Sequence, residues 1–221
     1  MKQGKIAESV LKRSVFKQLH LKRPDVLLAA GIGEDCAAFA VAEDEVAVIS
    51  ADPVIWEDSL DGRCAVHANL NDLAAGGAEP VGLMLTALLP PEIEEAQMRQ
   101  MVQMIAQECE PLQVQILGGH TEVTDAVKRP VVSIAAVGKA KKGMLSTTTG
   151  AKPGDDIVVT KWIALEATAK LARSRREALL SRYPQHLLDD AERFQQYFSV
   201  IPEAATAVKS GVRAMHDVTT G

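Results

Sequence analysis

Oxygen-bearing side chains recur in this sequence near the ends of its apolar runs. The acids Glu34 and Asp35 follow two glycines in "GIGEDCAAF", and Asp52 follows the apolar run 45–50. The remaining members of the set are Asn71, Asp72, His120, Thr121, Glu122 and Asp217. Each residue alone has an ordinary explanation as a turn or surface residue. Together they are typical of positions that a rigid scaffold presents for chemistry.

Carboxylates that gather in one place require a cation, because buried or half-buried charges need partners. Hard oxygen ligands favour Mg²⁺, since the cysteines lack zinc-site spacing and there is little histidine. Mg²⁺ keeps several waters and bridges a few carboxylates to substrate phosphates. With Mg²⁺ present, these carboxylates and the glycine turns become compatible with a nucleoside triphosphate. The phosphate-loop pattern GxxxxGK[ST] is absent, as are GxSxG and HExxH.

The elements that must position these residues follow from hydrophobic periodicity. Helical spacing predicts helices over 5–20 and 62–76, a further helix after Pro90 and Pro91, and two helical pieces within 164–210. Apolar, mainly β-branched runs predict strands at 45–50, 81–90, 114–117, 131–138 and 157–160. The methionine stripe of the helix after Pro91 indicates core packing. Asp52 and the run 118–122 are then expected in turns that directly follow strands.

Composition excludes several classes of function. The net charge of −5 and the aromatic content of 4% argue against nucleic-acid binding. No apolar run has the roughly 18 residues that a membrane span requires, and the N-terminus lacks the apolar core of a signal peptide. Three widely spaced cysteines indicate a reducing compartment, so we expect a cytoplasmic protein. Cys36 is expected at a small, buried packing position.

A change of composition divides the chain. Residues 139–156 are rich in Lys, Thr, Gly and Pro and predict a linker. We therefore expect one domain over 1–140 and the start of a second domain over 141–221. The sequence ends in "MHDVTTG", which resembles a strand entering a glycine turn, so we expect the polypeptide to continue.

The ordered motifs resemble a known family. "GIGEDCAAF", "ISADPV", "NLNDLAAGGAEP", "ILGGHTEVT", "TTTGAKPGDDIVVTKWIALEATA" and "MHDVTTG" look like the aminoimidazole ribonucleotide (AIR) synthetase superfamily. This PurM-like ATP-binding group includes the hydrogenase maturation factor HypE, thiamine-monophosphate kinase and selenophosphate synthetase. The run "GGHTEVTDAVKRPVVSIAAVG" looks most like HypE and AIR synthase-related proteins, because thiamine-phosphate kinases usually have Asp after the paired glycines.

The resemblance implies an α/β (α+β) fold. The N-terminal sheet would pair with that of a second subunit into a dimeric barrel, and an incomplete α/β domain would follow. ATP would bind with magnesium near the subunit interface. The implied metal ligands are Asp35, Asp52, Asp72 and Asp217. Asn71 would orient the phosphate site, and the implied phosphate-approaching residues are Gly33, Gly118, Gly119, His120, Thr121 and Glu122.

The implied activity is that of a Mg·ATP-dependent enzyme. It would activate an amide or carbonyl oxygen, or transfer a phosphoryl group to a small acceptor, and a HypE-like protein would also have a maturation partner. The sequence departs from HypE in two ways: it begins with "MKQGKIAESVLKRSVFKQLH" in place of a glycine-rich segment, and it ends before the position of HypE's C-terminal cysteine. Two alternatives therefore stay open, a thiamine-monophosphate kinase-like phosphotransferase and a non-catalytic dimeric partner-binding module.

Overall fold

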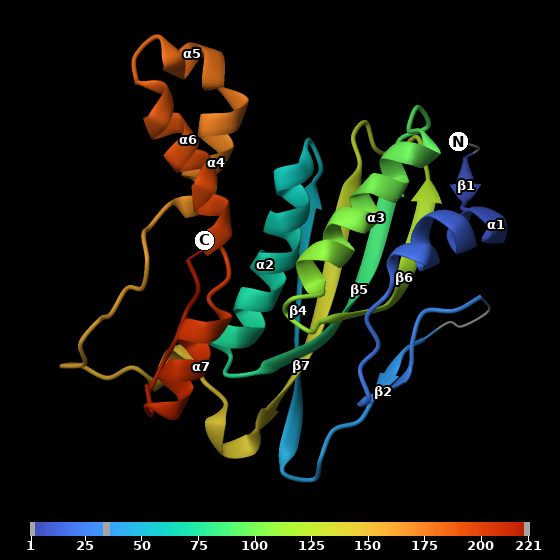
Figure 1. Cartoon of the computed structure of the whole chain (residues 1–221). Helices are drawn as coiled ribbons and strands as arrows, with labels where there is room; N and C mark the ends of the chain where they lie inside the picture. Colours follow the sequence, from blue (N-terminus) through green and yellow to red (C-terminus); the bar gives the residue numbers. More distant parts are fainter. Residues whose placement is uncertain (1–2, 33–35, 219–221) are drawn as a thin grey trace.

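A five-stranded mixed sheet organises the N-terminal part of the chain (Figure 1). The structure is a computed structural model, and it describes residues 3–32 and 36–218. The strand order is β1-β6-β5-β7-β4, in which β5 and β6 run parallel and the other neighbours antiparallel. The strands are β1 (Gly4–Lys5), β4 (Glu45–Ile55), β5 (Glu79–Leu89), β6 (Gln115–Val123) and β7 (Val131–Lys141). A separate pair consists of β2 (Val26–Leu28) and β3 (Ala38–Phe39).

Two helices cover one face of this sheet, α2 (Ser59–Ala75) and α3 (Glu95–Cys109) (Figure 1). Their inward side chains meet alternate residues of the strands in one hydrophobic core. Met98 and Met101 of α3 are 1% and 6% exposed, which confirms that the methionine stripe is core packing. The largest fully buried members of the core include Leu70, Leu73, Leu83, Leu89, Ile105 and Ile134.

The start of α2 is determined by local hydrogen bonds. Asp58 accepts a bond of 2.6 Å from the N–H of Leu60, while the carboxylate of Asp61 accepts from the N–H groups of Glu57 and Asp58. This reciprocal capping satisfies donors that the first turn of a helix leaves without partners. The helix consequently begins three residues earlier than the hydrophobic pattern predicted.

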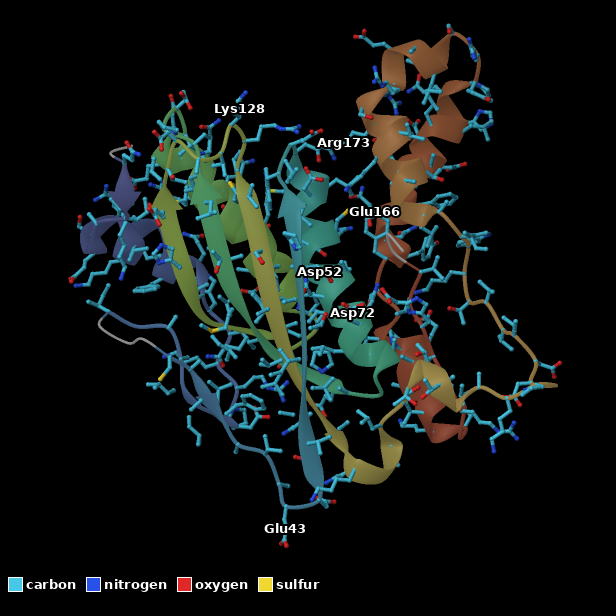
Figure 2. The ribbon with its side chains drawn as sticks, turned by 180° about the vertical axis from the view of Figure 1, so that it is seen from behind. Glu43, Asp52, Asp72, Lys128, Glu166 and Arg173 are labelled. Atoms are coloured by element: carbon cyan, nitrogen blue, oxygen red, sulfur yellow. The ribbon has the colours of Figure 1, made fainter. Side chains whose placement is uncertain are left out.

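No helix of the described residues covers the opposite face of the sheet, as the view from behind in Figure 2 shows. We call this the open face. On β4 it presents Ile49 and Ile55, whose exposed fractions are 68% and 52%. Among the residues that the structure describes, the strands of one chain form an open sheet and do not close into a barrel. The expected barrel would therefore need a second copy of the chain.

The C-terminal part is helical. Its helices are α4 (Leu165–Ser174), α5 (Arg176–Leu180), α6 (Gln185–Arg193) and α7 (Ile201–Lys209), with breaks close to the predicted positions. The predicted strand 157–160 is wrong, because Ile157 and Val158 are 94% and 82% exposed and pair with no strand of the described chain. Within 142–218, the described residues include no strand, and the connections contain only short 3-10 turns, η3 (Lys142–Met144), η4 (Thr148–Gly150) and η5 (Phe194–Tyr197).

The N-terminal segment is less regular than predicted. In place of one helix over 5–20, it contains α1 (Glu8–Val10), a π-helical turn η1 (Leu11–Val15) and a 3-10 turn η2 (Phe16–Gln18). Arg13 and Ser14 both bond to Glu95, at the first turn of α3. These bonds hold the N-terminal segment against α3. Among the described residues, no helix is long and apolar enough to cross a membrane.

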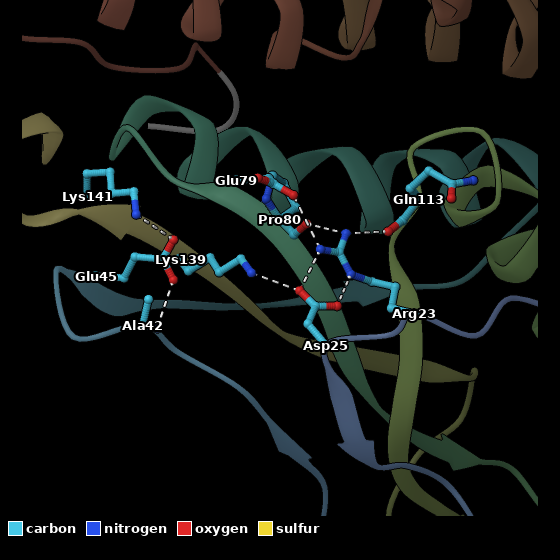
Figure 3. A network of polar contacts seen from close by, with 9 residues as sticks. All are labelled: Arg23, Asp25, Ala42, Glu45, Glu79, Pro80, Gln113, Lys139 and Lys141. Atoms are coloured by element: carbon cyan, nitrogen blue, oxygen red, sulfur yellow. Dashed lines mark hydrogen bonds and ion pairs between the residues drawn. The ribbon is translucent and has the colours of Figure 1, made fainter.

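A charged network fixes the chain just before β2 (Figure 3). Arg23 pairs with Asp25 at 2.8 Å and donates to the carbonyl of Gln113 at 2.9 Å. Asp25 also pairs with Lys139 of β7 at 2.9 Å. The bonds from Arg23, together with those from Lys139, hold the pKa of Asp25 far below its usual value. This network ties the β2–β3 segment to one end of the sheet.

Candidate functional site

The strand β4 and the helix α2 bring Asp52 and Asp72 together (Figure 2). Asp52 pairs in the sheet with the buried Ile134, so its side chain points to the helix-covered face. Partial burial, together with a hydrogen bond and charge from Asp72, raises the pKa of Asp52 above its usual value. The setting therefore disfavours ionisation of Asp52, and a cation placed beside its carboxylate would offset this effect.

Two neighbouring side chains orient this pair. The hydroxyl of Ser50, two residues before Asp52 on β4, donates a short hydrogen bond to the carboxylate of Asp72. Asn69, one turn before Asp72 on α2, is fully buried and accepts a bond of 2.9 Å from the N–H of Asp52. Its amide donates to the carbonyl of Ala65 at 2.9 Å. The backbone of Asp52 is thus tied to the helix that carries Asp72.

The donor set fits Mg²⁺ with a phosphorylated ligand. Burial and the neighbouring Asp72 raise the pKa of Asp52, and a bound divalent cation would favour the ionised form of that carboxylate. One or two carboxylates with substrate phosphates and waters are a usual magnesium environment. Within the described ranges, no three His, Cys, Asp or Glu side chains form a metal-binding group. A metal held by the Asp52–Asp72 pair would therefore need further ligands, which phosphates and waters could supply.

The structure corrects the expected setting of Asp52. Strand β4 continues through Pro53 to Ile55, so Asp52 lies inside the strand and not in a turn after it. Proline is tolerated there because β4 is an edge strand of the sheet. The side chain is therefore held by sheet pairing, which is more rigid than a turn.

Asn71 lies on α2 as predicted, but it contacts the C-terminal region. Its amide donates to the carbonyl of Phe198 at 2.8 Å, and its oxygen accepts from the N–H of Val200 at 2.9 Å. Because both contacts are to the backbone between η5 and α7, Asn71 tethers these elements to α2. Its expected role in orienting phosphate stays a prediction.

The expected turn at 118–122 is wrong, because β6 runs without a break from Gln115 to Val123. The paired glycines directly follow a β-bulge at Leu117, opposite Leu83 and Met84. Gly119 has φ +147°, and a Cβ there would lie 1.9 Å from the carbonyl oxygen of Leu85. A close approach between two strands therefore explains this glycine.

His120 and Glu122 lie on the open face, away from the carboxylate pair. They align in the sheet with Thr86 and Leu88, whose side chains point away from the helices, and His120 contacts Glu122 at 3.1 Å. Thr121 alternates to the helix-covered face. Three strand spacings, about 14 Å, separate β6 from β4. One chain therefore does not bring His120 and Glu122 to Asp52 and Asp72.

The remaining predicted residues have different outcomes. Asp217 is 5% exposed and lies 3.7 Å from the ring of His216, and it forms no three-carboxylate group with Asp52 and Asp72 in the described chain. Gly33, Glu34 and Asp35 lie outside the described residues. Cys36 is exposed, so the expectation of a buried packing position is wrong.

Two functional candidates were missed from the sequence, Ser50 and Asn69. Ser50 sits two residues before Asp52, and a strand places such residues on one face. Asn69 sits three residues before Asp72, which a helix places on one side. Both spacings are present in the sequence, but Ser50 and Asn69 reach the carboxylate pair only because β4 packs against α2.

The mixed five-stranded sheet with helices packed on it places the chain among the α/β proteins. Residues 33–140 match the family profile described as AIR synthase related protein, N-terminal domain. This part of the chain therefore belongs to the AIR synthase-related, PurM-like family.

Curated relatives of two kinds match the chain. It is 29% identical over 196 residues to carbamoyl dehydratase HypE of Cupriavidus necator, covering 86% of this chain and 54% of the relative. It is 33% identical over 154 residues to thiamine-monophosphate kinase of Escherichia coli, covering 66% of this chain and 45% of the kinase. The chain thus spans about half the length of these relatives. Because the two identities are similar, they do not favour HypE over the kinase.

Solved structures of both kinds share the fold. Thiamine-monophosphate kinase from Stenotrophomonas maltophilia superposes with a TM-score of 0.70 at 25% identity, covering 92% of this chain and 65% of the other. The hydrogenase maturation protein HypE in complex with ATP superposes with a TM-score of 0.56 at 18% identity, covering 66% of this chain and 43% of the HypE chain.

Proposed function

We propose that this chain binds Mg·ATP at the Asp52–Asp72 pair and serves an ATP-dependent reaction on a small acceptor. The observation that carries the proposal is the contact of two carboxylates on a rigid strand and helix, with the pKa of Asp52 raised. Two comparisons support it: one group of relatives is named as a kinase, and a HypE structure with this fold holds ATP.

Each residue of the site has a distinct role in this proposal. Asp52 and Asp72 would hold the metal, which supplies charge neutralisation to the phosphates when bound. Ser50 and Asn69 keep the two carboxylates in place. Reactions of this kind depend on positioning and on charge neutralisation, so rigid support of the ligands matters as much as the ligands.

The roles of the run 118–122 depend on a second copy of the chain. His120 and Glu122 face away from the carboxylate pair within one chain. We therefore infer that any contact of these residues with ATP requires a homodimer that pairs the open faces. The apolar side chains of Ile49 and Ile55 on that face support such pairing.

Calorimetric titration with ATP, with and without Mg²⁺, tests the proposal. We expect binding that requires Mg²⁺ and falls at least tenfold in an Asp52→Asn/Asp72→Asn variant. The exposed Glu43→Gln serves as the control, because it removes a charge at the far end of β4 (Figure 2). Equal binding by the double variant and the native chain would refute the site.

The identity of the small acceptor substrate would distinguish between the remaining candidate activities. Similarity to thiamine-monophosphate kinases in sequence and fold supports a phosphotransferase. Release of ADP that depends on thiamine monophosphate would support this candidate, and its absence in a Mg·ATP-binding preparation would favour HypE-like activation of an amide or carbonyl oxygen. A partner-binding module would bind no nucleotide.

A further inference from the structure

A groove of about 510 Å³ lies beyond the C-terminal end of β4. Its walls come from the residues after β4, the first turns of α3 and the last turn of α4. Trp56 lies four residues after Asp52, about 13 Å along an extended chain, so the groove is separate from the carboxylate pair. Its volume lies in the range of small-molecule sites.

The floor of the groove is apolar and rigid. Trp56, Ile93 and Met101 line it and are 8%, 6% and 6% exposed. The indole of Trp56 packs on α2 at Gly62, where a Cβ would lie only 2.6 Å from the ring. Because that space is closed, the indole is held in one place. A fixed aromatic ring and a methionine side chain that line the same groove suit a flat, polarisable ligand.

The rim of the groove carries an excess of negative charge. Asp58 pairs with Arg173 at 3.1 Å, and Glu57 pairs with Arg129, so these charges compensate one another. Glu92 also lines the groove, and no ion pair to it exists in the described part of the chain. One carboxylate is therefore left to balance the charge of a ligand.

We propose that this Trp56 groove, lined by Trp56, Glu92, Ile93, Met101 and Arg173, binds a small organic cation with a flat apolar ring. The indole and the methionine receive the ring, and Glu92 attracts the positive charge. A phosphorylated or carboxylated ligand is disfavoured by the same carboxylate. The proposal is independent of Mg·ATP binding.

Tryptophan fluorescence provides a direct test, because the chain has only two tryptophans. In a Trp162→Phe background, Trp56 is the sole reporter. We expect saturable quenching by 1-methylnicotinamide, a flat cation, with affinity about tenfold higher than for the neutral nicotinamide. Glu92→Gln should abolish most of this difference, whereas Glu43→Gln should not alter it.

Three outcomes would overturn the proposal: quenching that does not saturate, equal affinity for the two probes, or unchanged binding in Glu92→Gln. Calorimetry on the chain with both tryptophans repeats the test without the background substitution. Asp52→Asn should lose Mg·ATP affinity and keep affinity for 1-methylnicotinamide. Failure of this groove and failure of the Mg·ATP site are therefore distinguishable.

Discussion

The backbone N–H of Asp52 donates a 2.9 Å hydrogen bond to the side-chain oxygen of Asn69. This bond crosses from an edge strand to a buried position on α2, the helix that also carries Asp72. Through it, the spacing between two candidate metal ligands depends on a residue that touches neither metal nor phosphate in the proposed site. Asn69 is therefore a positioning residue.

Replacing Asn69 should weaken nucleotide binding as well as the fold. Asn69→Ala leaves the N–H of Asp52 without its acceptor, at a cost of about 1–3 kcal/mol in the free energy of unfolding. We expect Mg·ATP affinity, measured by calorimetry, to fall about tenfold. Asn71→Ala is the matched control, since Asn71 is a buried asparagine of the same helix that contacts residues 198–200. Equal losses of affinity would show that Asn71 also serves the site.

Neutralising Asp52 should stabilise the protein without ligand. Because the folded state raises the pKa of Asp52, it holds that proton more tightly than the unfolded state, so ionisation reduces stability as pH rises. Asp52→Asn should therefore unfold at higher urea than the native chain at pH 7, by roughly 0.5 kcal/mol after solvent screening. The advantage should disappear below the usual pKa of Asp. A variant less stable than the native chain at pH 7 would contradict the assignment.

The Glu95 cluster predicts loss of stability in acid. Bonds from Arg13 and Ser14 lower the pKa of Glu95 to about 2, from 4.5. Because the folded pKa is depressed, the cluster stabilises the fold above pH 4.5, and this contribution is lost as pH falls towards 2. Glu95→Gln should thus be less stable than the native chain at pH 7 and equal to it near pH 2, measured by urea unfolding. A pH-independent difference would refute the ion-pair explanation.

Adding one methyl group at Gly119 should destabilise the folded protein. The side chain would collide with the backbone of Leu85, and φ +147° is strained for any L-residue. We expect Gly119→Ala to lower the free energy of unfolding by at least about 2 kcal/mol. At Gly143 a Cβ meets nothing within 4 Å, so Gly143→Ala is a suitable control. Similar stability of the two variants would mean that β6 can shift.

A charge on the open face should prevent self-association. If the open faces of two copies pair, sedimentation will show a dimer, and Ile49→Lys will shift it to monomer. Ile157→Lys provides the comparison, because Ile157 is exposed but lies outside the sheet. A native chain that remains monomeric at micromolar concentration would exclude the shared barrel.

The local pattern of apolar residues was sufficient to predict many of the helices and strands. The stripe that includes Met98, Met101 and Ile105 predicted α3, and apolar runs predicted four strands of the main sheet. The spacing around Asn71 and Asp72 placed both on α2. These features depend on side chains a few residues apart, which local sequence determines. Strand ends were less predictable, because β4 and β6 continue wherever a neighbouring strand supplies hydrogen bonds.

By itself, the sequence determined the chemistry available to this protein: a set of oxygen ligands suited to magnesium, the helices and strands that carry them, and a resemblance to a PurM-like family. Only the tertiary structure decided which residues meet. Asp52 and Asp72 share the helix-covered side, His120 and Glu122 lie on the open face, and Asn71 binds a segment 127 residues away. The physical reason is that the face of a strand residue depends on sheet register and on helix packing. Both come from contacts between distant parts of the chain.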